Sequence, residues 1–360
     1  MAPESRRYAN IQALRAVAAL LVVFGHTLDH HFDFGLPVLA EVSRWIGYSG
    51  VDMFFVISGF VIALVVSRMP TEQGWRRLQG VGLFLARRAI RIYPIYWIVL
   101  AVVVLGLQRL FTIADFRVWL PHHDMLINVL LLASSNEYLP QAWSMGFEVL
   151  FYGLVAGALL AAPRRFFLIV AIVIGGWSAY ACAQPPVPFA NPMALEFLFG
   201  IAAAAGLAGG RPRPRLALWA GGLLYALGAG LTARSPGLLG ESLRVATFGV
   251  GAAGLVYGLA AAERLGLWVA GPVLGRLGDA SYSIYLWHLA VLWTAKWAFG
   301  SAAIVPGLLR WFAVLGLIVG GGLASYRWLE RPLIMALNGG LRALSMRLPA
   351  KAGLSLSEET

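Results

Sequence analysis

Charged residues are scarce in this chain of 360 residues, since Asp, Glu, Lys and Arg together make up only 12% of it. Soluble domains carry about 25% charged residues, whereas apolar residues here reach 59%. This composition excludes an ordinary soluble domain and indicates a helical protein embedded in a membrane. The net charge of +11 does not point to nucleic acid, because the basic residues are scattered between apolar runs and not gathered in one domain.

Cysteine is nearly absent, and several catalytic motifs are missing. The single cysteine, Cys182, excludes an internal disulfide and a cysteine zinc site. The sequence contains no Gly-rich phosphate loop, no nucleophile elbow and no zinc-protease helix. Two stretches rich in His and Asp, residues 30–33 and 122–124, have the composition of metal ligands but lack a supporting spacing. We therefore expect neither a bound metal nor a nucleic-acid partner.

Long apolar runs, by contrast, recur along the whole chain, and ten of them can cross a membrane as helices. The predicted spans lie near residues 10–29, 45–67, 82–107, 142–162, 166–183, 191–208, 216–233, 244–262, 281–299 and 306–329. Arg15 interrupts the first run, so we interpret this run as a retained span and not as a cleaved signal peptide. No internal repeat is visible. The predicted fold is an all-α integral-membrane bundle of about ten transmembrane helices.

The distribution of basic residues predicts the orientation of this bundle. The segments on the same side of the membrane as the N-terminus hold 18 of the 28 Lys and Arg residues. The positive-inside rule therefore places both termini in the cytoplasm. We assign residues 1–340 to one membrane domain and residues 341–360 to a short cytoplasmic tail that we expect to be disordered. The longest outer connection, residues 108–141, contains the apolar run Met125–Ala133 and predicts a short re-entrant or interfacial helix near its end.

Two ionisable residues share one face of the first predicted span. Arg15 and His26 are separated by ten residues without a polar side chain. Eleven helical steps return almost to the starting direction and cover about 16 Å along the axis. Buried ionisable groups in a membrane suggest function, and histidine is suited to accept a proton near neutral pH. The alternative is that Arg15 snorkels to the cytoplasmic surface while His26 lies among the outer headgroups.

A carboxylate and an arginine cluster accompany this pair. Asp52, in the sequence GVDMFF, lies at the outer start of the second span, where it can orient the imidazole of His26. A favourable interaction with the helix dipole is the alternative for Asp52. Arg87, Arg88 and Arg91 lie where the third span enters the membrane, and guanidinium groups bind phosphate bidentately. Plain positive-inside anchoring explains Arg87 and Arg88 as well, but it does not explain the deeper Arg91.

Two further groups of polar residues open later spans. Trp143 is placed to anchor the fourth span at the interface, and Ser144 and Glu148 follow on one face of that helix. A lone carboxylate such as Glu148 within an apolar helix should be paired or functional. Tyr285 and His288 share a stripe of the ninth span and can line the same cavity as Glu148. For His288, the alternative is a buried histidine with a purely structural role.

Taken in order, these motifs resemble the acyltransferase 3 family of bacterial inner-membrane acyltransferases. The resemblance rests on Arg15 and His26 with their ten-residue spacing, on GVDMFF, on Arg88-Ala-Ile-Arg91, on Trp143-Ser144 with Glu148, and on SYSIYLWH at residues 281–288. It runs from residue 11 to residue 288, nearly the whole chain. The opening sequence IQALRAVAALLVVFGH is most similar to the exopolysaccharide-production branch.

The resemblance implies a multi-pass inner-membrane O-acyltransferase. Such an enzyme moves an acyl group, usually acetyl, from cytoplasmic acyl-coenzyme A to a sugar hydroxyl on the outer side of the membrane. Acyl-coenzyme A is then a co-substrate and not a permanently bound cofactor. The residues with implied catalytic roles are His26, Asp52, Arg15 and Glu148. Those implied to bind the donor are Arg87, Arg88 and Arg91, and those implied to bind the acceptor are Trp143, Ser144, Tyr285 and His288.

Several alternatives stay open at this point. The acceptor can be a surface or exported polysaccharide, a glycosylated small molecule such as a macrolide, or a lipid-linked oligosaccharide. The acetyl group can pass directly or through an acyl-enzyme, with direct transfer the simpler route. A different class is a proton-coupled transporter or flippase without covalent chemistry, in which the intramembrane charges form a path. Acetyl-coenzyme A binding separates that class from the enzymes.

Overall fold

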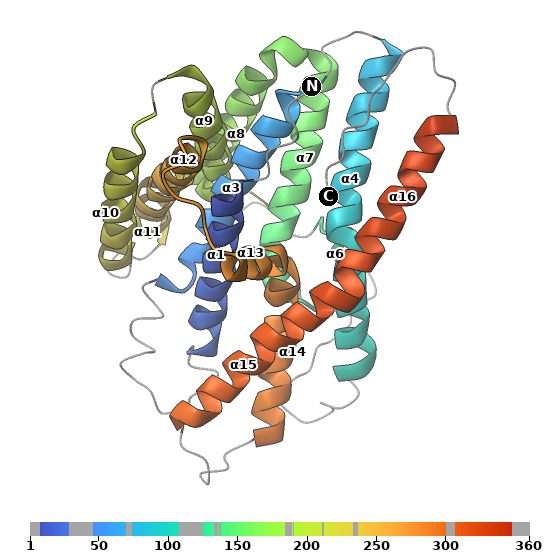
Figure 1. Cartoon of the computed structure of the whole chain (residues 1–360), viewed down its shortest axis with the longest axis vertical. Helices are drawn as coiled ribbons and strands as arrows, with labels where there is room; N and C mark the ends of the chain where they lie inside the picture. Colours follow the sequence, from blue (N-terminus) through green and yellow to red (C-terminus); the bar gives the residue numbers. More distant parts are fainter. Residues whose placement is uncertain are drawn as a thin grey trace.

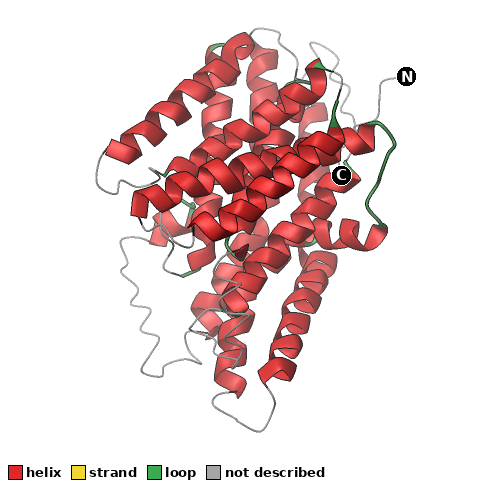
Figure 2. Cartoon of the chain, turned by 90° about the vertical axis from the view of Figure 1, so that its left-hand side faces the viewer, coloured by secondary structure: helices red, strands yellow, loops and turns green. Residues whose placement is uncertain are grey.

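The structure, a computed structural model, describes residues 8–28, 46–69, 74–107, 125–132, 136, 138–183, 189, 191–210, 212–232, 237–299 and 307–347. Within these residues every regular element is a helix (Figure 2). The N-terminal helices are α1 (Ala9–Thr27), α3 (Ser49–Val66), α4 (Trp75–Ala101), η1 (Val102–Leu107) and α6 (Met125–Val129). The middle helices are η2 (Pro140–Ala142), α7 (Trp143–Ala161), η3 (Pro163–Arg165), α8 (Phe166–Ala183), η4 (Pro192–Ala194), α9 (Leu195–Gly209) and α10 (Pro214–Thr232). The C-terminal helices are α11 (Gly237–Arg244), η5 (Val245–Gly249), α12 (Val250–Arg264), α13 (Pro272–Asp279), α14 (Ser281–Phe299), α15 (Gly307–Ser325), η6 (Tyr326–Glu330) and α16 (Arg331–Arg347).

All ten predicted spans coincide with helices, which confirms the all-α membrane bundle. Among the described residues, eight helical stretches are long and apolar enough to cross a membrane. Helices α10 and α14 do not meet that criterion, although each has 19 residues. Polar side chains such as Ser281, Ser283 and His288 make α14 less apolar than its neighbours. The count of ten spans and the cytoplasmic location of both termini therefore stay predictions.

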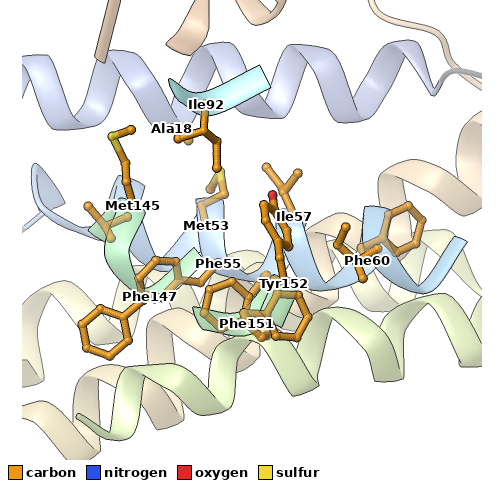
Figure 3. Packing of buried hydrophobic residues seen from close by; sticks show 14 of the residues in the cluster. Ala18, Met53, Phe55, Ile57, Phe60, Ile92, Met145, Phe147, Phe151 and Tyr152 are labelled. Atoms are coloured by element: carbon orange, nitrogen blue, oxygen red, sulfur yellow. The ribbon is translucent and has the colours of Figure 1, made fainter. Parts of the chain in front are cut away.

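The helix α3 lies at the centre of the bundle and contacts α1, α9 and α12. It is the most deeply buried of the candidate spans, whereas α8 presents most of its surface to the outside. Figure 3 shows apolar side chains of α3 packed against those of α7. Phe197 of α9 stacks between Phe55 and Phe151, with ring centroids 4.6 and 4.3 Å apart. This aromatic stack joins three helices at the core.

Close helix contacts at the centre depend on glycine. A Cβ atom on Gly59 would lie 2.0 Å from the carbonyl oxygen of Phe197, and one on Gly200 would lie 2.0 Å from that of Val56. On the other side of α3, a Cβ on Gly50 would lie 2.2 Å from the carbonyl oxygen of Ala18. Small residues allow helix backbones to approach closely in membranes. These glycines therefore set the spacing of α1, α3 and α9.

Three boundaries differ from the sequence-based prediction or refine it. Helix α4 begins at Trp75, so the arginines predicted at the entrance of the third span lie well inside a long helix. The helices α15, η6 and α16 form one slanting rod to Arg347, and α16 packs against α4 (Figure 1). Residues 341–347, predicted to belong to the terminal tail, are thus helical, while residues 348–360 lie outside the described part. The short helix α6 lies at the start of the apolar run in the long connection, and its predicted re-entrant or interfacial character stays a prediction.

Candidate active site

Ionisable side chains from four elements meet near the middle of the bundle. We call Arg15 of α1, Arg91 of α4, Glu148 and Tyr152 of α7, and Glu330 of η6 the central polar cluster. The Nε of Arg15 donates a hydrogen bond to Ser281 Oγ of α14 at 3.3 Å. The other charged groups of this cluster lie within electrostatic range of the Arg15 guanidinium. The clustering argues against Arg15 as a side chain that merely snorkels to the surface.

Glu148 has the partners that its position inside an apolar helix requires. Its Oε1 accepts a hydrogen bond from Ser58 Oγ of α3 at 2.7 Å and another from the hydroxyl of Tyr152, one turn further along α7. The carboxylate is nevertheless only partly buried. It can therefore face a ligand that enters between α3, α4 and α7.

The arginines of α4 reach the cluster from its other side. The Cζ atom of Arg88 lies 5.9 Å from the ring centroids of both Phe84 and Tyr152. Its Nε, one of the five N–H donors of the guanidinium, is buried and has no hydrogen-bond partner among the described residues. Arg91 lies one turn further along the helix, close enough to Arg15 for the two charges to repel each other. The structure thus brings Arg88 and Arg91 together with Arg15, and the predicted role of Arg87 stays a prediction.

Glu330 is a member of the cluster that the sequence analysis missed. It ends η6, only 1% of its side chain is exposed, and its Oε2 accepts a hydrogen bond from Ser283 Oγ at 2.7 Å. Its Oε1 is buried and has no hydrogen-bond partner within the part of the chain that the structure describes. The last predicted span stopped at residue 329, so the rule that intramembrane carboxylates are functional was not applied to Glu330.

His26 lies in the last turn of α1, about 16 Å along the axis from Arg15. Its Nδ1 lies 2.9 Å from the carbonyl oxygen of Val22. The centroid of its ring is 4.9 Å from that of His288 on α14 and 5.0 Å from that of Tyr48. His26 is partly exposed, whereas His288 is fully buried. The end of the site away from the central polar cluster is therefore built from two imidazole rings and one phenol ring.

Asp52 is paired with Arg244 and not, as predicted, with His26. Both oxygens of the buried Asp52 carboxylate accept hydrogen bonds from Arg244, at 2.8 and 3.1 Å from Nε and at 2.7 Å from Nη2. The buried carboxyl group of Glu196 on α9 lies beside this pair. Asp52 points toward α9 and α11 because it lies on a different face of α3 from the one that meets the end of α1. This arrangement corrects the predicted orienting contact.

Asp52 is nevertheless connected to His26 through Arg244 and Tyr48. Nη2 of Arg244 also donates a hydrogen bond to the carbonyl oxygen of Tyr48 at 3.1 Å. The ring of Tyr48 packs edge-on against the imidazole of His26. The ion pair of Asp52 and Arg244 thus fixes the backbone of a residue that supports the imidazole. Arg244 lies at the edge of a predicted span, and the sequence gives no signal for this pairing.

The residues predicted to bind the acceptor hold one another in place. Ser144 Oγ lies 2.8 Å from the Tyr285 hydroxyl, which also donates to the carbonyl oxygen of Gln141 at 2.7 Å. Gln141 in turn donates through Nε2 to the carbonyl oxygen of Leu286 at 2.8 Å. These bonds fix the start of α7 against α14. Trp143 packs its ring against Phe55 and Phe147, with centroids 6.3 and 5.8 Å away.

No group of three His, Cys, Asp or Glu side chains gathers as metal ligands within the described residues. The histidine-rich stretches at residues 30–33 and 122–124 lie outside the part of the chain that the structure describes.

These features define a multi-pass membrane protein in which basic and acidic side chains converge inside the helix bundle, as in enzymes and transporters of the membrane. The chain belongs to the acyltransferase 3 family, since the family model described as "Acyltransferase domain" matches residues 8–327. The membership predicted from the motifs is thereby confirmed, and the protein is an acyltransferase.

Two curated proteins are similar to this chain over most of their length. "Exopolysaccharide production protein ExoZ" of Rhizobium meliloti (strain 1021) is 35% identical over 327 residues, which cover 85% of this chain and 95% of that protein. The protein named "Putative membrane-bound transacylase BcsY" of Komagataeibacter xylinus is 25% identical over 352 residues, covering 89% of this chain and 79% of that protein. No solved structure matches the chain.

Proposed function

We propose that this acyltransferase moves an acetyl group from cytoplasmic acetyl-coenzyme A to a sugar hydroxyl of an exported polysaccharide. One observation carries the proposal: Arg15 of α1 and Arg88 and Arg91 of α4 gather around Tyr152 inside the bundle, and His26 lies on the same helix as Arg15. The name of the relative ExoZ, an exopolysaccharide production protein, supports a polysaccharide as the acceptor. The excess of Arg on the N-terminal side supports an inner-membrane protein with cytoplasmic termini.

The donor binds through its phosphate groups. Arg88 and Arg91 present guanidinium groups at one face of α4, and Arg15 adds a third positive charge opposite them. Such groups bind phosphate oxygens with two parallel hydrogen bonds. Arg15 and Arg91 repel each other, and the carboxyl groups of Glu148 and Glu330 balance only part of the positive charge of the three arginines. The remaining positive charge favours binding of the nucleotide phosphates of coenzyme A.

His26 serves as the general base. A carbonyl oxygen only accepts hydrogen bonds, so the contact with Val22 fixes the proton on Nδ1 and leaves the lone pair on Nε2. The acceptor oxygen attacks the thioester carbonyl carbon while its proton moves to Nε2. The carbon–sulfur bond then breaks, and the thiolate of coenzyme A takes up the proton. This direct route needs no acyl-enzyme.

The separation of about 16 Å between the α1 positions of Arg15 and His26 favours donor binding over oxyanion stabilisation as the role of Arg15. An oxyanion-stabilising group must lie within about 3 Å of the reacting oxygen, next to the base. Arg15 points toward the central polar cluster and is too far from His26 for that role. We therefore assign Arg15 to donor binding, with the pantetheine arm spanning the distance to His26.

The proposal is tested with purified protein in lipid nanodiscs and with whole cells. Nanodiscs should bind acetyl-coenzyme A, and cells that carry the gene should add an O-acetyl mass increment to their exported polysaccharide. His26→Ala should abolish the increment and keep donor binding, because the base lies away from the arginines. If the protein neither binds acetyl-coenzyme A nor acetylates a sugar, the proposal is wrong. Acetylation of a small glycoside or of a lipid-linked oligosaccharide alone would overturn the polysaccharide acceptor.

A further inference from the structure

His288 is a fully buried histidine with one nitrogen that no described group satisfies. It lies on α14, and its Nδ1 contacts the carbonyl oxygen of Tyr285, three residues earlier. Its Nε2 is buried and has no hydrogen-bond partner. Buried polar atoms of this kind are uncommon and call for an explanation, because an unmade hydrogen bond costs about 1–3 kcal/mol.

The contacts of the two histidines fix the same tautomer in both rings. Each Nδ1 faces a backbone carbonyl oxygen of its own helix, that of Val22 for His26 and that of Tyr285 for His288. Since a carbonyl cannot donate, each Nδ1 carries the proton when its ring is neutral. Both Nε2 atoms are then acceptors, and two acceptors cannot form a hydrogen bond with each other.

One additional proton changes this relation. The ring centroids are 4.9 Å apart and the ring planes are inclined by 59°. The χ2 torsion of histidine is soft, so a modest rotation of the partly exposed His26 can bring its Nε2 toward that of His288. A proton on one Nε2 then makes an N–H···N hydrogen bond to the other and satisfies the orphaned nitrogen.

We propose that His288 is a positioning residue for the acyl transfer, which accepts a hydrogen bond from the protonated ring of His26 and shares its proton. The inference rests on the proposed function of His26 as the base. Because His288 has no exposed surface, it acts through His26 and does not contact the acceptor. The other titratable side chains with ring contacts to the pair are Tyr48 and Tyr285, and the hydroxyl of Tyr285 already contacts Ser144 and Gln141.

Two substitutions separate this role from a purely structural one. In His288→Asn, the side-chain amide keeps a donor near the Nδ1 position but has no acceptor at Nε2. In His288→Gln, the amide oxygen reaches the Nε2 position and can accept the hydrogen bond without taking the proton. We expect His288→Asn to lower kcat about tenfold or more with KM nearly unchanged, and His288→Gln to recover most of that loss. The opposite order, with Asn active and Gln impaired, would show that only the contact with Tyr285 matters.

A second measurement does not depend on catalysis. The chain has six histidines, so imidazole ¹⁵N resonances of the labelled full-length protein in nanodiscs can be assigned by single substitutions. If the proton is shared, the resonances of His26 and His288 should move together with one midpoint as pH is changed. A His288 resonance that stays constant through the titration of His26 would overturn the inference. If no acyl transfer is found at all but the two rings titrate together, the proposed function fails while the proton sharing stands.

Discussion

Removal of the Arg244 guanidinium should destabilise the protein more than removal of its carboxylate partner. Arg244→Met leaves Asp52 and Glu196 as two adjacent buried carboxyl groups with no described cation to compensate them. Breaking a buried pair from one side costs about 3–5 kcal/mol, because the remaining charge stays desolvated. Asp52→Asn should cost less, about 1–3 kcal/mol, since the carboxyl of Glu196 remains beside Arg244 and can balance its charge.

This asymmetry can be measured by unfolding the purified protein with SDS in mixed micelles and following tryptophan fluorescence. Arg276→Met, which removes an exposed arginine on α13, is the matched control and should change the free energy of unfolding by less than about 1 kcal/mol. The double variant Asp52→Asn/Arg244→Met should be less destabilised than the sum of the single variants. If Arg244→Met matches the control, or if Asp52→Asn is the more damaging single change, the reasoning about this triad is refuted.

Three further predictions concern the centre of the bundle. Glu330→Gln should lower the rate of acetyl transfer at least tenfold while the protein still folds, because the side-chain shape and the contact with Ser283 are kept and only the charge is lost. A wild-type rate of acetyl transfer by the variant in nanodiscs would contradict a role of that charge. Arg91→Gln should raise the Kd for coenzyme A by about 10-fold to 100-fold in a calorimetric titration, whereas Arg164→Gln, an exposed control, should not. Gly200→Ala should cost about 1–3 kcal/mol or more in SDS unfolding because its Cβ would lie 2.0 Å from a carbonyl oxygen, whereas Gly153→Ala, which meets open space, should be neutral or stabilising.

Much of the architecture follows from patterns in the sequence. Apolar runs of sufficient length predict where helices form, and the 3.6-residue period places Arg88 and Arg91 on a common face. The rule that an intramembrane carboxylate needs partners correctly predicts that Glu148 is hydrogen-bonded. The sequence alone could not decide which of several faces of α3 meets which helix. The partner of Asp52 depends on that choice, so the predicted contact with His26 was wrong.

Two of the charged residues that sequence reasoning missed are next to π-helical segments. Arg244 directly precedes η5, and Glu330 is the last residue of η6. A π-helical turn holds more residues than an α-helical turn, so it shifts the faces of the residues that follow it relative to those before it. A prediction that continues the 3.6-residue period through such a segment assigns the wrong face and ends or begins the span at the wrong residue. The predicted span edges near residues 244 and 329 follow the apolar runs, which carry no sign of this change of period.

The same segments explain why these charges can be buried at all. Both η5 and η6 lie within continuous helical rods, so their backbone polar groups bond within the helix while the register changes. The change of register at η6 turns Glu330 toward Ser283 and the arginines, and the one at η5 lets Arg244 face Asp52 while α12 packs against α10. π-helical turns occur often at functional sites because they redirect a side chain without breaking the helix. In this protein they bring Glu330 into the central polar cluster and Arg244 onto Asp52. The search for further functional residues in such bundles should therefore begin at charged residues beside a break in helical period.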